Sequence, residues 1–189
     1  DNVLVSHKSI YFLKNKRTEK DGYMAIKLDM SKAYDRVEWV FQTNIMHKIG
    51  FCPKWIQWIL ECITSVTYFI NVNGEKRGFI KPSRSLRQGD PLSPYLFIIC
   101  TEGLSNLLKK AVERKQLTGI KICKDSSMVS HLFFADDSLL CCKASKQEAQ
   151  KIKEIIQKYG QATGQVVNFD KSAMFFTRNT PHRLRGEIS

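Results

Sequence analysis

Two adjacent carboxylates, Asp136 and Asp137, lie in the middle of the apolar stretch HLFFADDSLLCC, residues 131–142. An ionised carboxylate is costly in apolar surroundings unless a cation or hydrogen-bond donors compensate it. Two-residue hairpin turns prefer Asn-Gly or Asp-Gly, because positive φ angles are costly for other residues. The pattern predicts two short strands that meet at the Asp pair, within a largely buried sheet. For the pair taken alone, the ordinary alternative is a solvated hairpin turn.

That turn is the favoured interpretation of the pair by itself, but the apolar neighbours make a functional site, with a bound divalent cation, a reasonable hypothesis. Like charges and local strain together are typical of functional sites, and hard divalent cations bind oxygen ligands. Asp29 offers a third carboxylate, since the alternating segment GYMAIKLDM, residues 22–30, predicts a strand that ends near it. The alternative role for Asp29 is the N-cap of a following helix, and the two roles are compatible.

The rest of the chain alternates between helical and strand-like patterns. Helical spacing or helix-start signals occur at residues 3–14, 37–49 (ended by Gly50), 53–63, 93–115 and 145–159, the last opened by a Ser145–Glu148 capping box. Strand patterns occur at residues 66–80, as a hairpin turning at Asn73-Gly74, and at 165–176, a strand that includes Lys171. This order predicts an α+β domain in which helices pack on one face of a mostly antiparallel sheet.

Composition limits the class of protein. The 189 residues suffice for one domain with a core, and 43% apolar content argues against disorder. A net charge of +12 favours a polyanionic partner, most often nucleic acid, although a solvated surface is the alternative. No apolar run reaches the roughly 18 residues of a membrane span. The six cysteines lack metal-ligand spacing, so we expect packed thiols in a reducing compartment.

Four motifs in order, KLDMSKAYDRV, LRQGDPLSP, FADDS and GQVVNFDKS, resemble the palm of a reverse transcriptase. The similarity is to LINE-type (non-LTR) retrotransposons, especially plant elements, and runs through nearly the whole chain. It implies a right-hand polymerase palm with part of the fingers, which copies an RNA template by adding deoxynucleoside triphosphates to a DNA primer. We expect residues 1–189 to form a single palm domain truncated at both ends, without most of the fingers, the thumb or the endonuclease. The family also implies a nuclear or cytoplasmic ribonucleoprotein location.

The resemblance assigns the carboxylates to a two-metal site. Asp29 and Asp136 would hold two Mg²⁺ ions, with Mn²⁺ as a possible substitute, and Asp137 would assist or lie in a second shell. Two metals about 3.5–4 Å apart can bind both the attacking 3′-hydroxyl and the leaving pyrophosphate oxygens. A sparse protein site suits Mg²⁺, which keeps several waters.

The resemblance also assigns the nucleotide contacts. Tyr34 would lie under the sugar and exclude a ribose 2′-hydroxyl, whereas its ordinary alternative is core packing. Gln88 and Gly89 would contact the nucleotide and the templating base, in a loop that also leads into a helix. Lys171 would act near the triphosphate, with a solvated lysine as an equal alternative. Ser85 departs from the family's glycine, which is costly if that position has a positive φ.

Several alternatives stay open. The chain could be a catalytically inactive, nucleic-acid-binding remnant, an intron-maturase-like reverse transcriptase, or a viral RNA-copying polymerase, although Tyr34 favours DNA synthesis. His131 fits a packed sheet residue better than a catalytic base. Trp55 and Trp58 offer rings for base stacking, but core packing is the preferred interpretation.

Overall fold

The computed structural model describes residues 2–16, 21–123, 126–134 and 137–188. Its helices and strands alternate along the chain much as the sequence pattern predicts. In order they are α1 (Asn2–Asn15), β1 (Tyr23–Leu28), α2 (Trp39–Ile49), α3 (Pro53–Thr64), β2 (Tyr68–Val72), β3 (Glu75–Ile80), α4 (Ser93–Glu113), β4 (His131–Phe134), β5 (Asp137–Lys143), α5 (Lys146–Thr163), β6 (Ala173–Phe176) and α6 (His182–Ile188). Within the described residues, no helix is long and apolar enough to cross a membrane.

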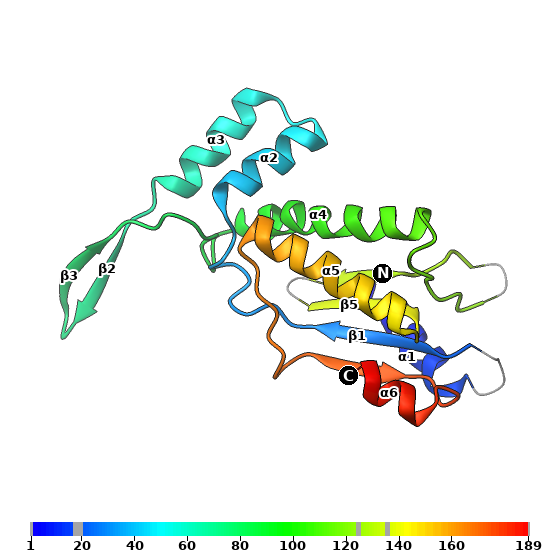
Figure 1. The fold of residues 1–189 in the computed structure, drawn as a ribbon. Coiled ribbons are helices and arrows are strands. Elements are labelled where there is room, and N and C mark those ends of the chain that lie inside the picture. Colours follow the sequence, from blue (N-terminus) through cyan, green and yellow to red (C-terminus); the bar gives the residue numbers. More distant parts are fainter. Residues whose placement is uncertain (1, 17–20, 124–125, 135–136, 189) are drawn as a thin grey trace.

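Four antiparallel strands form the central sheet, in the order β4-β5-β1-β6. Strand β1 is therefore an inner strand, and Met24 pairs with Cys142 on one side and with Phe176 on the other. Helices α4 and α5 lie over one face of this sheet (Figure 1). The expected α+β architecture, with helices packed on an antiparallel sheet, is confirmed.

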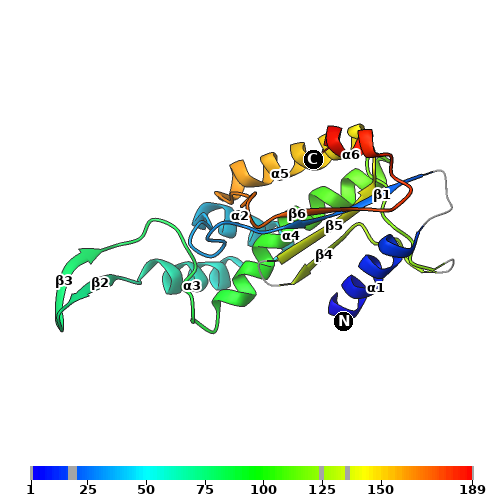
Figure 2. The ribbon, with the colours of Figure 1, turned by 90° about the horizontal axis from the view of Figure 1, so that it is seen from below.

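The two faces of the sheet are buried in separate apolar clusters. Met24, Leu140 and Cys142 belong to the main core beneath α4 and α5, whereas Ala25 and Cys141 belong to a smaller cluster. Side chains alternate between faces along a strand, so neighbouring residues enter different clusters. Helix α1 covers the second cluster, on the opposite side of the sheet from α5 (Figure 2). This second layer is additional to the predicted one.

The capping box predicted for α5 is half present. The Ser145 hydroxyl accepts a hydrogen bond from the backbone N–H of Glu148 at 3.2 Å. The Glu148 carboxylate does not return to Ser145; it accepts instead from the backbone N–H groups of Lys143 (3.1 Å) and Thr118 (2.9 Å). A buried carboxylate therefore joins the end of β5 to the segment that follows α4.

Strands β2 and β3 form a separate two-stranded hairpin that projects away from the sheet (Figure 1). Asn73 and Gly74 have φ angles of 52° and 88°, as a type I′ turn requires, so the predicted turn is confirmed. Every residue of β3 is exposed. The hairpin is therefore held by its own strands and by the chain at its base, not by the core.

Candidate active site

Asp29 and Asp137 lie at the same end of neighbouring strands. β1 ends at Leu28, which pairs with Ser138, so Asp29 follows the last paired residue of β1 and Asp137 precedes its partner on β5. The predicted strand-end position of Asp29 is confirmed. Asp136, assigned with Asp29 to the metals, lies outside the described residues. The fold thus brings together two of the three predicted carboxylates from distant parts of the sequence.

The backbone of Asp29 is held from both sides by one short loop. Its N–H donates to the Ser172 hydroxyl at 3.2 Å, and its carbonyl accepts from the N–H of Asn168 at 2.9 Å. Among the described residues, the half-buried Asp29 carboxylate has no hydrogen bond or ion pair. The N-cap of α2 is Glu38, so Asp29 does not cap that helix. A fixed backbone with an unpaired carboxylate suits a ligand-binding role.

Asp137 has a counter-ion that the sequence analysis did not identify. The Lys27 ammonium lies 3.2 Å from its carboxylate oxygen, and about half of each side chain is exposed. Lys27 precedes Asp29 by two residues, so strand alternation places both on the same face of β1. That alternation was the signal that could have found Lys27. In this structure the lysine neutralises Asp137, whose side chain is exposed and not enclosed by the apolar residues around it in the sequence.

Lys171 is not in a strand, contrary to prediction. β6 begins only at Ala173, and Lys171 lies exposed in a turn closed by the Ser172 N–H and hydroxyl, which both donate to the Asn168 carbonyl, at 3.0 and 2.7 Å. The backbone groups of this loop form hydrogen bonds with Asp29 and within the loop's own turn. They are therefore not free to pair with a neighbouring strand at this position. The structure nevertheless carries Lys171 on the loop that contacts Asp29.

Tyr34 lies in the turn after β1, with its ring stacked on Phe97 of α4 at a centroid distance of 4.8 Å and an interplanar angle of 20°. Its backbone carbonyl accepts from the N–H of Leu86 at 2.8 Å. The half-buried ring therefore packs against the core, as the ordinary alternative requires. The same contacts bring the loop before α4 beside the turn that follows Asp29.

The loop before α4 adopts two left-handed backbone conformations. Ser85 has φ 102° and Gly89 has φ 82°. Ser85 is fixed there, because its N–H donates to the Val37 carbonyl at 3.0 Å and its carbonyl accepts from the Trp39 indole at 2.7 Å. Ser85 therefore has the positive φ that the sequence analysis gave as the condition for a cost. At Gly89 a Cβ would meet nothing within 4 Å, so the residue faces open space.

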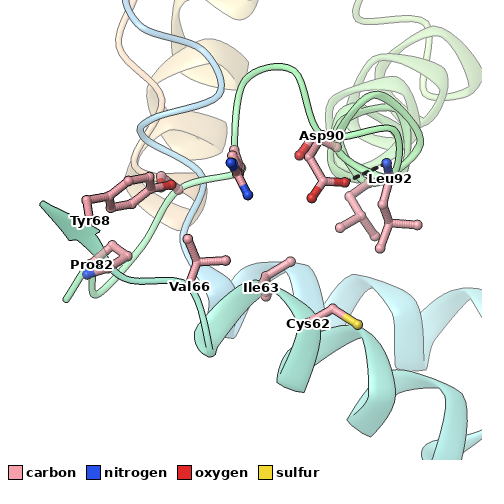
Figure 3. A pocket seen from close by; sticks show the side chains of 11 residues that line it. Cys62, Ile63, Val66, Tyr68, Pro82, Asp90 and Leu92 are labelled. Carbon is pink, nitrogen blue, oxygen red and sulfur yellow. Dashed lines mark hydrogen bonds between the residues drawn. The ribbon is translucent and has the colours of Figure 1, made fainter. Parts of the chain in front are cut away.

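A hollow of about 500 Å³ lies beside this loop. Gln88 is part of its wall, and the full lining is Asp35, Tyr68, Pro82, Ser83, Arg84, Ser85, Leu86, Arg87 and Gln88. A smaller cavity of about 20 Å³ lies between α3 and the start of α4, where the Asp90 carboxylate accepts from the N–H of Leu92 at 2.8 Å (Figure 3). Asp90 thus fixes the end of the loop, and the larger hollow is lined mostly by polar and charged side chains.

His131, the first residue of β4, is a packed sheet residue that contacts α4, as expected. Its Nε2 lies 3.1 Å from the Ser105 hydroxyl and its Nδ1 lies 2.9 Å from the Ser130 hydroxyl. Burial lowers the pKa of His131, Lys109 lowers it further, and Glu102 acts in the opposite direction. The imidazole is therefore held neutral between two hydroxyls, away from the carboxylates at the sheet end.

Core packing of Trp55 and Trp58 was the wrong interpretation. The two side chains are 43% and 49% exposed on α3, and their rings form an edge-to-face pair at 6.2 Å. The Lys54 ammonium lies 5.2 Å from the centre of the Trp58 ring. Helix α3 instead buries Ile56 and Ile59.

The described side chains do not by themselves form a metal cluster. Among residues 2–16, 21–123, 126–134 and 137–188, no group of three or more His, Cys, Asp or Glu side chains could hold a metal ion. Asp29 and Asp137 are nevertheless hard oxygen donors at one sheet end, which is the donor type that Mg²⁺ and Mn²⁺ prefer. The donor chemistry therefore fits a divalent cation, with Asp136 needed to complete the set.

The sequence model of one family, reverse transcriptase (RNA-dependent DNA polymerase), matches residues 3–184. The Transposon TX1 149 kDa protein of Xenopus laevis is 26% identical over 92% of this chain and 12% of its own length. A Pol polyprotein from the type-1 retrotransposable element R2 of Popillia japonica is 31% identical over 69% of this chain and 20% of its own. An uncharacterized mitochondrial protein of Arabidopsis thaliana is 55% identical, over 35% of this chain and 55% of its own. The chain thus spans about half the length of the Arabidopsis thaliana relative and a fifth or less of the other two.

Solved telomerase structures share the fold. A telomerase of Candida tropicalis superposes with a TM-score of 0.67 at 16% identity, over 94% of this chain and 29% of its own. A telomerase of Candida albicans superposes with a TM-score of 0.61 at 15% identity, over 95% of this chain and 30% of the telomerase chain. With the family match over residues 3–184 and the retrotransposon relatives, the chain belongs to the reverse transcriptase (RNA-dependent DNA polymerase) family, as a domain of a LINE-type element.

Proposed function

We propose that this chain is the nucleotidyl-transfer core of a non-LTR retrotransposon polymerase, which extends a DNA primer on an RNA template. The observation that carries the proposal is the meeting of Asp29 and Asp137 at one end of the sheet, beside the turn and loop that hold Tyr34 and Gln88. Family membership supports the reaction class. The telomerase of Candida tropicalis, which was solved with a fragment of telomeric RNA, is consistent with an RNA template.

Members of this family generally use divalent metal ions. In this chain Asp29, Asp136 and Asp137 would hold two Mg²⁺ ions, or Mn²⁺ in their place. When bound, the ions would neutralise charge on the triphosphate and favour the ionised primer hydroxyl. The residues of the chain prepare this site: Ser172 and Asn168 fix the Asp29 backbone, and Lys27 stays paired with Asp137 until a stronger cation competes for it.

The nucleotide would lie between the loop before α4 and the turn after β1. Gln88 and Gly89 would contact the nucleotide and the templating base, with the hollow beside Gln88 as the available space. The Tyr34 ring is stacked on Phe97 and only half-buried, and its exposed part would face the sugar. Lys171 would stabilise charge on the leaving pyrophosphate or protonate it, from a loop held against Asp29.

Primer extension by the full-length parent protein tests the proposal, with an RNA template, a DNA primer, deoxynucleotides and Mg²⁺. Asp29→Asn should slow extension by at least about a hundredfold, because metal ligation contributes several kcal/mol to the transition state. Asp21→Asn is the matched control, since Asp21 is an exposed carboxylate near the opposite end of β1 that pairs with Lys143 at 2.7 Å. Equal rates for Asp29→Asn and the parent would show the metal assignment to be wrong. A parent protein without activity would support the inactive remnant.

A further inference from the structure

We propose that the β2–β3 hairpin is a binding platform for single-stranded RNA, which receives the template strand outside the nucleotide site. This proposal rests on the proposed function only for the identity of the strand. The surface itself follows from the exposure, geometry and charge of the hairpin.

The hairpin leaves large apolar side chains in solvent. Phe69 is 53% exposed and Phe79 is 65% exposed; Ile70, Val72 and Ile80 are also exposed. Contiguous exposed apolar surface on a folded domain marks an interaction site. A lone two-stranded hairpin is only marginally stable in water, so a partner that covers it also stabilises it.

A bulge brings the two phenylalanines together on one face. Tyr68 pairs with Ile80 and Ile70 pairs with Arg77, so β3 has one more residue than β2 in this interval, and Gly78 with φ 68° accommodates it. The rings of Phe69 and Phe79 then meet edge to face, with centroids 5.7 Å apart. Two exposed rings at this spacing offer successive flat surfaces to unstacked bases.

The polar residues differ between the two faces. Asn71 pairs with Lys76 across the strands, and alternation places both on the face of Phe69. Ile70 and Val72 occupy the other face with the cross-strand partners Arg77 and Glu75, whose side chains form an ion pair at 2.8 Å. The aromatic face therefore carries Lys76, which forms no ion pair with any residue that the structure describes, and the opposite face carries aliphatic side chains and a paired arginine.

The charge of the segment favours a polyanion. Residues 68–84 contain four cationic side chains, Lys76, Arg77, Lys81 and Arg84, against the single carboxylate of Glu75. Two of the four are in ion pairs, Arg77 with Glu75 at 2.8 Å and Arg84 with Glu38 at 3.2 Å, so the excess positive charge lies on Lys76 and Lys81. Aromatic rings flanked by cations are the usual composition of surfaces that bind single-stranded nucleic acid, because bases stack while phosphates are neutralised.

The base of the hairpin leads directly into the candidate nucleotide site. Tyr68 and Pro82, at the two ends of the hairpin, line the same hollow as Arg87 and Gln88. Figure 2 shows the hairpin reaching outward from this region, clear of the sheet. A strand held on Phe69 and Phe79 could therefore continue toward the templating position beside Gln88.

Binding of a labelled 12-nucleotide unstructured RNA to the 189-residue chain tests the proposal. Fluorescence anisotropy in EDTA, without deoxynucleotides, makes the readout independent of the metal site. The double variant Phe69→Ala, Phe79→Ala should bind at least about tenfold more weakly. Tyr11→Ala is the matched control, because Tyr11 is a 71% exposed aromatic residue on α1, and it should bind as the parent does.

A second variant separates base stacking from apolar contact. Phe69→Leu with Phe79→Leu keeps apolar bulk but removes the flat rings, so it should lose affinity nearly as the alanine variant does. Lys76→Ala should reduce the slope of log K against log salt by about 0.7, the value for one phosphate contact on a single strand. A single-stranded DNA of the same sequence measures the preference for RNA.

Three results would overturn the proposal. The first is parental affinity in the alanine variant, and the second is full affinity in the leucine variant. The third is a self-association, detected by light scattering, that the alanine variant abolishes while RNA affinity stays unchanged. Asp29→Asn should bind RNA as the parent does, so a failed metal assignment in primer extension would leave this result unaffected.

Discussion

Ser85 is strained, because a φ of 102° is costly for any residue with a Cβ. Two hydrogen bonds hold its backbone in this conformation, one from its N–H to the Val37 carbonyl and one from the Trp39 indole to its own carbonyl. The burial of the next residue, Leu86, also fixes the loop. Ser85→Gly should raise the free energy of unfolding by about 0.5–1 kcal/mol, the steric relief less the extra entropy of glycine in the unfolded chain. Urea unfolding at pH 7 measures this difference.

Ser83→Gly is the control for this variant. Ser83 is exposed in the same loop and is not among the described residues with positive φ. Glycine there adds only unfolded-state entropy and should lower stability by a few tenths of a kcal/mol. If both variants destabilised the protein alike, strain at Ser85 would be absent in solution.

The structural role of a single residue was predictable from the sequence where its own backbone preference determines that role. The end of α2 at Gly50 and the turn at Asn73-Gly74 follow from the need for positive φ, and both appear as expected. The strand position predicted for Lys171 and the core position predicted for Trp55 were wrong, because contacts with residues distant in the sequence determine both. The backbone beside Lys171 bonds to Asp29 instead of continuing β6, and Trp55 stays 43% exposed because α3 buries other residues.

At the scale of elements, His131 couples the stability of the β4–α4 contact to pH. Burial between Ser105 and Ser130 and the nearby Lys109 lower its pKa in the folded protein, against the opposing effect of Glu102. The unfolded chain, with a histidine pKa near 6.5, therefore binds the proton first as the pH falls. The histidine's contribution to stability is present above pH 6.5 and is lost progressively below it.

Chemical unfolding at pH 7.5 and pH 5.5 checks this sign. The parent should lose more stability on acidification than His131→Asn, which has no titratable ring. His47→Asn, at an exposed position on α2, should lose as much as the parent. A parent whose stability rose toward pH 5.5 relative to His131→Asn would show that the folded protein prefers the charged imidazole.

At the scale of the whole molecule, the order of elements and the antiparallel sheet follow from periodicity. The second layer formed by α1 does not, because it consists of contacts between α1 and the sheet face that holds Ala25 and Cys141. Their burial depends on Leu13 of α1, which lies far from Cys141 in the sequence. Long-range packing of this kind leaves no local signal, unlike the position of Lys27, which strand alternation places on the same face as Asp29.

The molecule divides energetically into a core and a dispensable hairpin. Tyr68 and Ile80 are paired, so replacing Phe69–Phe79 by a short Gly-Ser link should close the chain without moving α3 or the loop before α4. The free energy of unfolding should stay within about 1 kcal/mol of the parent, since the removed side chains are exposed. Leu140→Ala, at a fully buried position on β5, should by contrast cost about 2–5 kcal/mol. Urea unfolding of both variants makes the comparison, and a hairpin deletion as costly as Leu140→Ala would mean that β2 and β3 pack on the core in solution.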